Sequence, residues 1–246
     1  MKKRLLVLGL AFTMLAATAC GTSSDGGNKT SKADKTVTAT SNSDKTSETQ
    51  KNDDKKDDAK ESYKSADDIT MDDLKNHEET PAEDFEYADG PDGSVVIEGY
   101  TGEDPIVVIP NEIDGKKVVD FGRMFTNNKD VVAIKVGDNV EDIMENAFTN
   151  CDNLKYIVFG KNVKVINDGL LGGSKIEQIE FNDGLEKLGS NVSGVGLKSK
   201  IDVSIPESVT EMTFRGAKTL IVKSGSYAES YAKEYADKLG MAYKVE

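Results

Sequence analysis

The sequence predicts an α/β fold of the solenoid type, in which short coils of the chain stack and share one core. Between residues 118 and 222, apolar residues recur at the same offsets in consecutive copies. The copies are spaced by 23 residues from Ile134 to Ile157, by 22 to Ile179 and by 24 to Val203. Each copy contains an apolar-x-apolar triplet typical of a short β-strand. A period of 20 to 29 residues with these offsets indicates a leucine-rich-repeat solenoid.

One coil of this length is too small to bury its own apolar face, so it has to stack on its neighbours. We expect each coil to contribute one short strand to a parallel sheet, with equivalent residues aligned in buried columns. The expected columns are Ile134, Ile157, Ile179 and Val203; Val136, Phe159, Phe181 and Ile205; Val140, Val163, Leu185 and Val209; and Phe121, Ile143, Ile166, Leu188 and Met212.

The segment before the repeats is predicted to cover the first coil, whose apolar surface would otherwise face water. Residues 85–100 read as a β-hairpin, because two apolar runs flank the turn-forming residues Asp89–Gly93. We expect this hairpin to cap the N-terminal end of the solenoid, next to the first repeat strand at Ile106–Pro110.

The last residues predict a helix that caps the other end, followed by a strand at Met241–Val245. Ser226 is a suitable N-cap residue and Gly240 a suitable helix stop. Four large side chains recur every four residues and predict the stripe through which this helix packs. A ligand platform is the alternative interpretation of the stripe. Its members are Tyr227, Tyr231, Tyr235 and Leu239.

Residues 1–19 predict a secretion signal. Basic residues at 2–4 precede an apolar run at 5–16, which is too short to span a membrane, and small residues lead to Cys20. This order resembles the bacterial lipoprotein signal, in which the Cys is lipidated and becomes the mature N-terminus, although Ala17 stands where Leu is usual. Ordinary secretion with a free Cys20 is the alternative. Stable anchoring would require more than one acyl chain.

Residues 20–80 are predicted to form a disordered polar linker. Their composition of Ser, Thr, Asp, Asn, Lys and Gly contains almost no large apolar residue, so this segment cannot bury enough surface to fold. One alternative concerns its end, where Thr70–Asp73 resembles a capping box before Leu74 and allows a short helix near 70–79. The folded domain is expected to span residues 81–246.

Charge argues against a nucleic-acid partner. The formal net charge is −13, and it becomes −16 when the signal with Lys2, Lys3 and Arg4 is removed. Such an acidic chain repels nucleic acid and anionic lipid head groups. No basic patch with interleaved aromatic residues is present to overcome this repulsion.

Catalytic and metal-binding patterns are missing from the repeats, and we expect a protein that is not an enzyme and holds no cofactor. The single histidine, His77, lies in the polar segment, so no Ser–His or Cys–His pair can form in the repeats. Zinc requires Cys or His clusters. A carboxylate-based hydrolase remains the alternative, because acidic residues are numerous. Cys151 is the only cysteine beyond Cys20. We expect a packed, structural thiol there.

The pattern Ile-x-x-x-Ala-Phe-x-x-Cys-x-x-Leu-x-x-Ile, as it stands in Ile143–Ile157, resembles the BspA-type leucine-rich repeat of bacterial surface proteins. The resemblance covers residues 95 to 246. It implies a right-handed superhelix with short parallel strands, an irregular or short-helical convex side, and an adhesive or protein-binding role at the cell surface. It implies no catalytic residue. The sequence departs from the pattern at Leu170–Gly173 and at Asn191–Lys200, where we expect locally loose coils.

The outward-facing strand residues are the candidate binding face, because repeat proteins bind through such extended surfaces. The strand pattern also places Ile106, Val108 and Ala133 on this side, and Tyr156 is a candidate aromatic anchor. The predicted binding residues are Lys135, Tyr156, Val158, Gln178, Glu180, Asp202 and Ser204.

The sequence therefore favours a lipid-anchored binding module on the extracellular face of the cell membrane, which recognises a protein or other cell-surface material. A structural or accessory envelope lipoprotein without a specific ligand is the alternative.

Overall fold

The computed structural model of the chain describes residues 65–190 and 201–246. The predicted signal at 1–19, the proposed lipid site Cys20, the predicted linker up to residue 64 and the irregular segment Asn191–Lys200 lie outside the described residues. Within 65–190 and 201–246, no helix combines the length and the apolar character needed to cross a bilayer.

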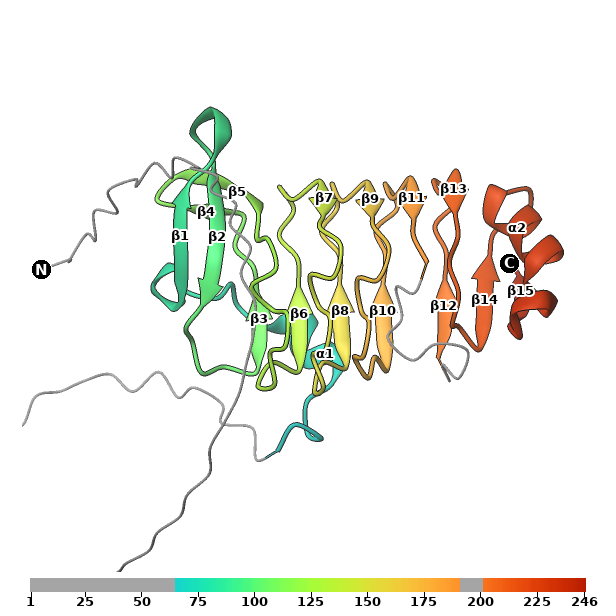
Figure 1. Ribbon diagram of the computed structural model, residues 1–246, viewed down its shortest axis with the longest axis horizontal. Coiled ribbons are helices and arrows are strands. Elements are labelled where there is room, and N and C mark those ends of the chain that lie inside the picture. Colours follow the sequence, from blue (N-terminus) through green and yellow to red (C-terminus); the bar gives the residue numbers. More distant parts are fainter. Residues whose placement is uncertain (1–64, 191–200) are drawn as a thin grey trace, which may run out of the picture. The chain divides into compact units, whose positions relative to one another are not determined.

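Two columns of parallel strands run along the repeats and confirm the predicted solenoid (Figure 1). In both columns the strands follow one another in chain order, each hydrogen-bonded to the next coil. The first column contains β3 (Ile106–Val108), β6 (Ala133–Lys135), β8 (Tyr156–Val158) and β10 (Gln178–Glu180). The second contains β7 (Asp142–Ile143), β9 (Val165–Ile166), β11 (Lys187–Leu188) and β13 (Glu211–Met212).

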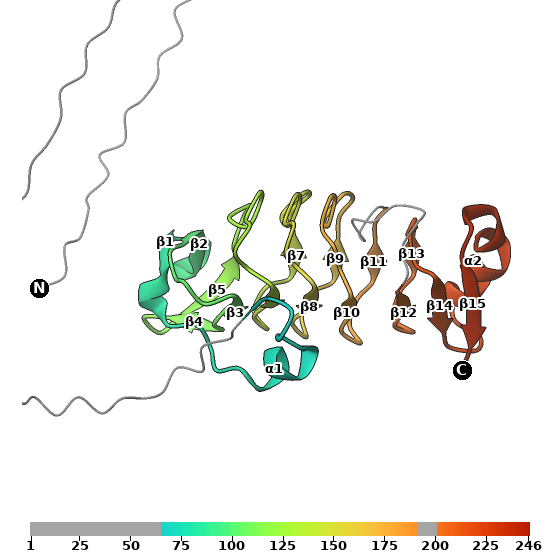
Figure 2. The same cartoon turned by 90° about the horizontal axis from the view of Figure 1, so that it is seen from below.

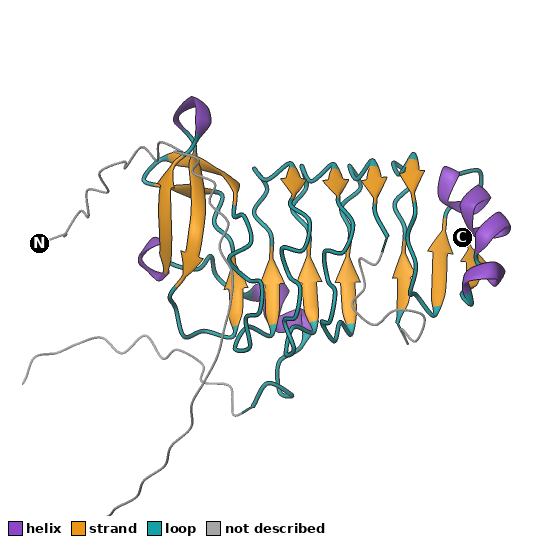
Figure 3. Cartoon of the chain, viewed as in Figure 1, coloured by secondary structure: helices purple, strands orange, loops and turns teal. Residues whose placement is uncertain are grey.

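The first column continues beside β10 with a further parallel sheet of β12, β14 and β15. Their bounds are β12 (Asp202–Ser204), β14 (Thr219–Val222) and β15 (Ala242–Val245). Between the strands of β6 to β13, the described coils consist of loops and turns rather than helices (Figure 3). In the described coils, the predicted convex side has the irregular form rather than the short-helical one.

The four predicted columns of apolar residues are buried, except that Phe181 is partly buried against Phe159, with ring centroids 5.5 Å apart. Fully burying such a side chain contributes roughly 1.5 to 3 kcal/mol. The column from Ile143 to Met212 forms a second ladder of two-residue strands, which the sequence did not predict as strands. Each coil therefore contributes two strands rather than one.

The coil at Leu170–Gly173 is well packed, so the expectation of a loose coil there is wrong. Leu170 and Leu171 are fully buried. Ser174 takes the role that Cys151 has one coil earlier, because its hydroxyl donates to the Phe148 carbonyl oxygen at 2.7 Å. Gly173 has φ +83° and continues the turn that Asn150 forms at φ 59° in the preceding coil.

Cys151 is a buried structural thiol, as predicted. Its sulfur donates to the Phe125 carbonyl oxygen at 2.9 Å. Burial raises the pKa of the Cys151 thiol to about 11. Because the thiolate is the reactive form, this thiol is protected from reagents at neutral pH.

The predicted N-terminal hairpin is present as the antiparallel pair β1 (Phe85–Asp89) and β2 (Val95–Tyr100). The turn between them places Asp92 and Gly93 at positive φ. β2 pairs in parallel with β5 (Lys116–Asp120), which pairs antiparallel with β4 (Glu112–Ile113). Short 3-10 turns, η1 (Ala82–Asp84) and η2 (Pro91–Gly93), flank β1.

The C-terminal helix α2 (Tyr227–Tyr235) is present, and the predicted stripe packs only in part: Tyr231 and Leu239 are partly buried against the main core, and the Tyr231 hydroxyl donates to the Phe214 carbonyl oxygen at 3.0 Å. Its buried side chains are Ala228 and Ala232, followed by Ala236. Tyr227 and Tyr235 are 43% and 38% exposed. The small alanines let the helix lie close to β13, β14 and β15, whereas tyrosines at the contact would hold it further away.

The predicted ends of α2 are confirmed. The Ser226 hydroxyl accepts from the Glu229 amide at 3.1 Å. After the 3-10 turn η4 (Asp237–Leu239), Gly240 has φ +70° and stops the helical segment.

The folded part begins before residue 81, inside the predicted linker, with the short helix α1 (Met71–Asn76). The capping box is confirmed, because the Asp73 amide donates to the Thr70 hydroxyl and the Thr70 amide donates to the Asp73 carboxylate. Ile69, Met71 and Leu74 are buried. Figure 2 shows α1 beside β3 and β8, on the outer side of the first strand column. Three apolar residues are enough to hold this segment in place because they pack on the apolar outer surface of β3 and β6.

Candidate functional site

The candidate site is the strand face, which we define as the outward residues of β3, β6, β8, β10, β12 and β14. In each three-residue strand the middle side chain is buried in the main core and its neighbours point outward, as alternation in a strand requires. The ladder places Tyr156 beside Gln178 and Val158 beside Glu180. Lys135 lies beside Val158. The predicted binding residues therefore lie on one surface.

Half of this strand face is covered by the chain itself. We call residues 65–80, which include α1, the strap. Ile69, Met71 and Leu74 of the strap form a second apolar cluster with outward residues that the sequence predicted to be a binding surface. Those residues lie on the predicted side of the sheet, yet they are at most 4% exposed because the strap covers them. They are Ile106, Val108 and Ala133.

Backbone hydrogen bonds fix the end of the strap along β3. The Thr80 amide donates to the Val108 carbonyl oxygen at 3.0 Å, and the Val108 amide donates to the Thr80 hydroxyl at 2.9 Å. Beside them, the Asn111 side-chain amide donates to the Glu79 carboxylate at 2.9 Å. The strap therefore occupies the outer edge of β3 as an additional extended segment.

Ion pairs hold the rest of the strap to β8, β10 and their flanks. Lys155 lies 2.5 Å from Asp67 and 3.7 Å from Glu177, and Lys75 of α1 lies 2.6 Å from Glu180. The hydrogen bond from Lys155 and the attraction of its charge hold the pKa of Asp67 below its usual value. The same hydrogen bond, with the charge of Glu177, raises the pKa of Lys155.

Tyr156, the predicted aromatic anchor, is partly buried against the strap cluster together with Val158. Its hydroxyl donates to the Glu177 carboxylate at 3.2 Å. Burial, and after it the charge of Glu177, raises the pKa of Tyr156. Tyr156 is thus part of the boundary between the covered and the open parts of the face.

The open part of the strand face consists of β10, β12 and β14. Gln178, Asp202 and Ser204 are exposed there. The ladder between β12 and β14 places Ile221 next to Ser204, and Lys218 lies 4.0 Å from Asp202. This surface combines hydroxyl, amide and carboxylate groups with one partly buried apolar side chain, which suits polar recognition of a protein surface.

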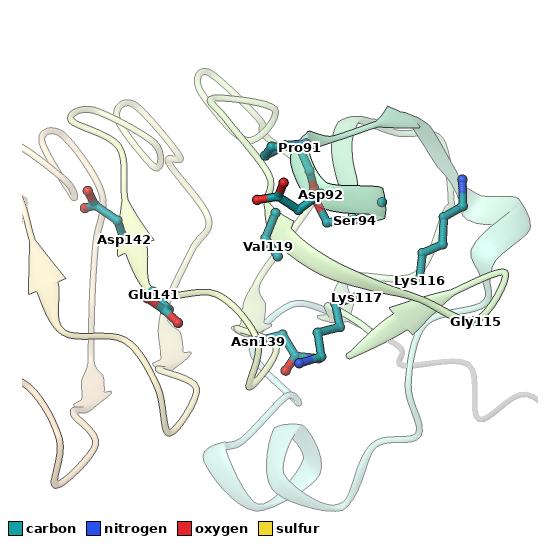
Figure 4. A pocket seen from close by; sticks show the side chains of 11 residues that line it. Pro91, Asp92, Ser94, Gly115, Lys116, Lys117, Val119, Asn139, Glu141 and Asp142 are labelled. Atoms are coloured by element: carbon teal, nitrogen blue, oxygen red, sulfur yellow. The ribbon is translucent and has the colours of Figure 1, made fainter.

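A hollow of about 660 Å³ lies beside the hairpin turn and β5, at a place that no sequence pattern marked. Figure 4 shows Glu141 and Asp142 on one side of it and Lys116 and Lys117 on the other. Lys116 forms an ion pair with Asp89. The lining contains neither Cys nor His and offers no nucleophile–base pair.

Over residues 65–190 and 201–246, no group of three or more His, Cys, Asp or Glu side chains is placed to hold a metal ion. His77 does lie in the strap, where its Nε2 is 3.6 Å from the Asp104 carboxylate. This pair joins the strap to the segment before β3, and it is not part of the open part of the face.

Comparison with known families finds a match over the repeats. The model of the BspA type leucine rich repeat region matches residues 122–217 in six copies. The matched range contains β6 to β13 and ends before β14, so it coincides with the regular coils. No curated protein sequence matches the chain.

Three solved structures of leucine-rich repeat proteins are similar to the chain. The protein from T. pallidum is 28% identical over 58% of this chain and 71% of its own, with a TM-score of 0.48. The protein from Bacteroides ovatus is 19% identical over 68% of this chain and 52% of its own, with a TM-score of 0.48. A leucine rich cell surface protein from Faecalibacterium prausnitzii is 16% identical over 58% of this chain and 54% of its own, with a TM-score of 0.31. The chain thus spans about half the length of the last two.

Proposed function

We propose that this protein is a non-enzymatic binding module, because residues 122–217 match the model of the BspA type leucine rich repeat region. It recognises another protein or cell-surface material outside the cell, and it is held on the membrane by lipid on Cys20. The observation that carries the proposal is the open part of the strand face, where Gln178 on β10 and Asp202 and Ser204 on β12 stand exposed on two strands that contact each other.

The chemistry of the open part favours a ligand with hydrogen-bonding groups. These side chains stand on strands rather than on loops, so a partner can meet them without ordering a loop first. Ile221 supplies apolar contact between polar neighbours. The acidic balance of the chain, −13 overall, favours a partner with basic or neutral contact groups.

Substitutions that change the charge and the size of side chains on the open part test this proposal. The full chain, immobilised through its N-terminal part, is incubated with solubilised envelope proteins, and the retained proteins are compared between variants. The triple variant Gln178→Ala, Asp202→Lys, Ser204→Arg should lose a partner that the parent chain retains. Glu145→Lys, which reverses one negative charge as Asp202→Lys does, at an exposed position outside the strand face, should retain it.

Two outcomes oppose the proposal. If the triple variant and the parent retain the same proteins in equal amounts, the open part is not the binding surface. If no protein is retained specifically by any variant, the structural or accessory role without a ligand becomes the better description.

A further inference from the structure

The strap packs on a cluster of its own, separate from the main core. On β3, the Val107 side chain lies in the main core, whereas Ile106 and Val108 point to the other side and meet the strap. On β6, Ile134 likewise lies in the main core, whereas Ala133 faces the strap. Removal of the strap would therefore leave the columns of the main core buried, and the coils could stay stacked.

The contacts that hold the strap are few. Three apolar side chains, the two hydrogen bonds between Thr80 and Val108, the hydrogen bond from Asn111 to Glu79 and a small number of ion pairs fix it to the sheet and its flanks. A helix of six residues is too short to be stable without its packing partner, and exposed ion pairs add little. Segments with so few buried contacts open locally before the rest of a protein unfolds.

The surface beneath the strap has the chemistry of a helix-docking site. Its floor is apolar and consists of Ile106, Val108, Val132 and Ala133. Tyr156 and Val158 form one border, and the basic residue Lys155 stands at the rim, where it meets Asp67. Glu180 lies at the rim as well, where it meets Lys75 of α1. A short amphipathic segment with apolar side chains on one side, an acidic residue before its helix and a basic residue near the helix end matches this surface, as the strap itself does.

We infer that the strap is a displaceable cover: it opens while the solenoid stays folded, and it thereby uncovers a second docking site for a short amphipathic helix that has an acidic residue before it and a basic residue near its end. This site extends the proposed binding face from its open part across β8, β6 and β3. The inference rests on the proposed binding role of the strand face. Its tests use only the chain itself and a peptide of the strap, and no natural partner. A failure of the partner experiment above and a failure here can therefore be told apart.

Native-state hydrogen exchange on the unmodified chain tests whether the strap opens by itself. The amides of Leu74, Thr80 and Val108 are hydrogen-bonded in or to the strap, whereas those of Val136 and Phe159 bond between coils. We expect the strap amides to exchange roughly 100-fold faster or more, with little dependence on denaturant, as local opening does. Equal protection of both groups of amides, with the same denaturant dependence, would overturn the inference.

Binding of the strap sequence in trans tests whether the uncovered surface is a docking site. Leu74→Asp places a charge in the apolar cluster and should detach the strap. A synthetic peptide of residues 65–80 should then bind the variant at least about tenfold more tightly than the unmodified chain, whose competent open fraction is small. A peptide that itself carries Leu74→Asp should not bind.

Asn76→Asp is the matched control, because it adds the same charge at an exposed strap position. It should behave as the unmodified chain does. Equal peptide binding by Leu74→Asp, Asn76→Asp and the unmodified chain contradicts the inference, and so does a Leu74→Asp chain that keeps its strand signal in circular dichroism but fails to bind the peptide. If Leu74→Asp abolishes the cooperative unfolding of the whole domain, the strap is an integral part of the core, and the inference is wrong.

Discussion

Asp67 and Lys155, which are 88 residues apart in the chain, form an ion pair of 2.5 Å that joins the predicted linker to the flank of β8. This contact begins the attachment of the strap, and the hydrogen bonds between Thr80 and Val108 end it. Between them lies the apolar cluster of Ile69, Met71 and Leu74. A segment with the composition of a linker thus acts as part of the fold and divides the candidate binding face.

The attachment of the strap should depend on pH through this pair. The pKa of Asp67 is lowered from 3.8 in the attached state, so its contribution is fully present above that value and is lost as the pH falls through the lowered pKa. The pKa of Lys155 is raised from 10.5, so its contribution is lost only as the pH rises through the raised pKa. Glu177 faces the same lysine.

The methyl resonance of Met71, which is buried in the attached strap, measures this effect by NMR. On going from pH 6 to pH 3 we expect the signal of the detached form to grow. Asp67→Asn should show more of that signal at pH 6 and a smaller change on acidification. An Asp67→Asn chain that responds to acid as strongly as the unmodified chain would remove Asp67 from this role.

The solenoid could be predicted from the sequence because its cause is local and repeated. The columns through Ile157 and Ile143 come from apolar offsets that recur in every coil, and burial of those offsets is what stacks the coils. The second strand ladder was missed because its strands are only two residues long. Two residues are too few to display a period of their own.

The coverage of the face and the packing of α2 depend on tertiary contacts that no local pattern contains. Ile69, Met71 and Leu74 are diluted among polar residues, so composition alone assigns their segment to the linker. On α2, hydrophobic size favoured Tyr227 as the packed side chain, whereas close approach of the helix selected Ala228. The outward position of Ala133 was predictable, but its burial follows from a strap more than fifty residues earlier in the chain.

Substitutions on α2 separate the alanine face from the tyrosine face. Ala232→Leu adds three carbons where the helix meets the last strands, and overpacking of this kind costs typically about 1 to 3 kcal/mol. Tyr227→Ala, at a side chain that is 43% exposed, should change the free energy of unfolding by no more than about 0.5 kcal/mol. Chemical denaturation of both variants measures the difference. Equal destabilisation would place Tyr227 in the packed face after all.

The hydroxyl of Ser174 should be needed because its acceptor, the Phe148 carbonyl oxygen, lies in the buried interior of the coil. Ser174→Ala leaves that oxygen without its donor and should lower the free energy of unfolding by about 1 to 3 kcal/mol. Ser174→Cys restores the thiol of the regular repeat and should recover a large part of the loss. If Ala and Cys destabilise the protein equally, the substitution acts through packing and not through this hydrogen bond.

The thiol of Cys151 should resist modification in the folded protein. Its burial and its pKa of about 11 keep it protonated and out of contact with solvent at pH 7.5. A maleimide reagent should therefore label the unmodified chain slowly in buffer and rapidly in denaturant, as mass spectrometry of the peptide containing Cys151 would show. Ser174→Cys provides a control at the equivalent position of the next coil and should be equally slow. Rapid labelling of Cys151 without denaturant would show that the coils open at this position.

Lipid attachment at Cys20 leads to a prediction about where the protein resides. If Cys20 carries the lipid, Cys20→Ser should move the protein from the membrane fraction to the medium or the soluble envelope fraction, because the basic and apolar signal still directs export. Growth with a labelled fatty acid should label the parent chain and Cys151→Ala, which keeps Cys20, but not Cys20→Ser. Membrane association that survives Cys20→Ser would mean that the signal stays attached as the anchor, or that the protein is held by a partner. In either case the statements about the strap and the solenoid are unaffected, because neither contains Cys20.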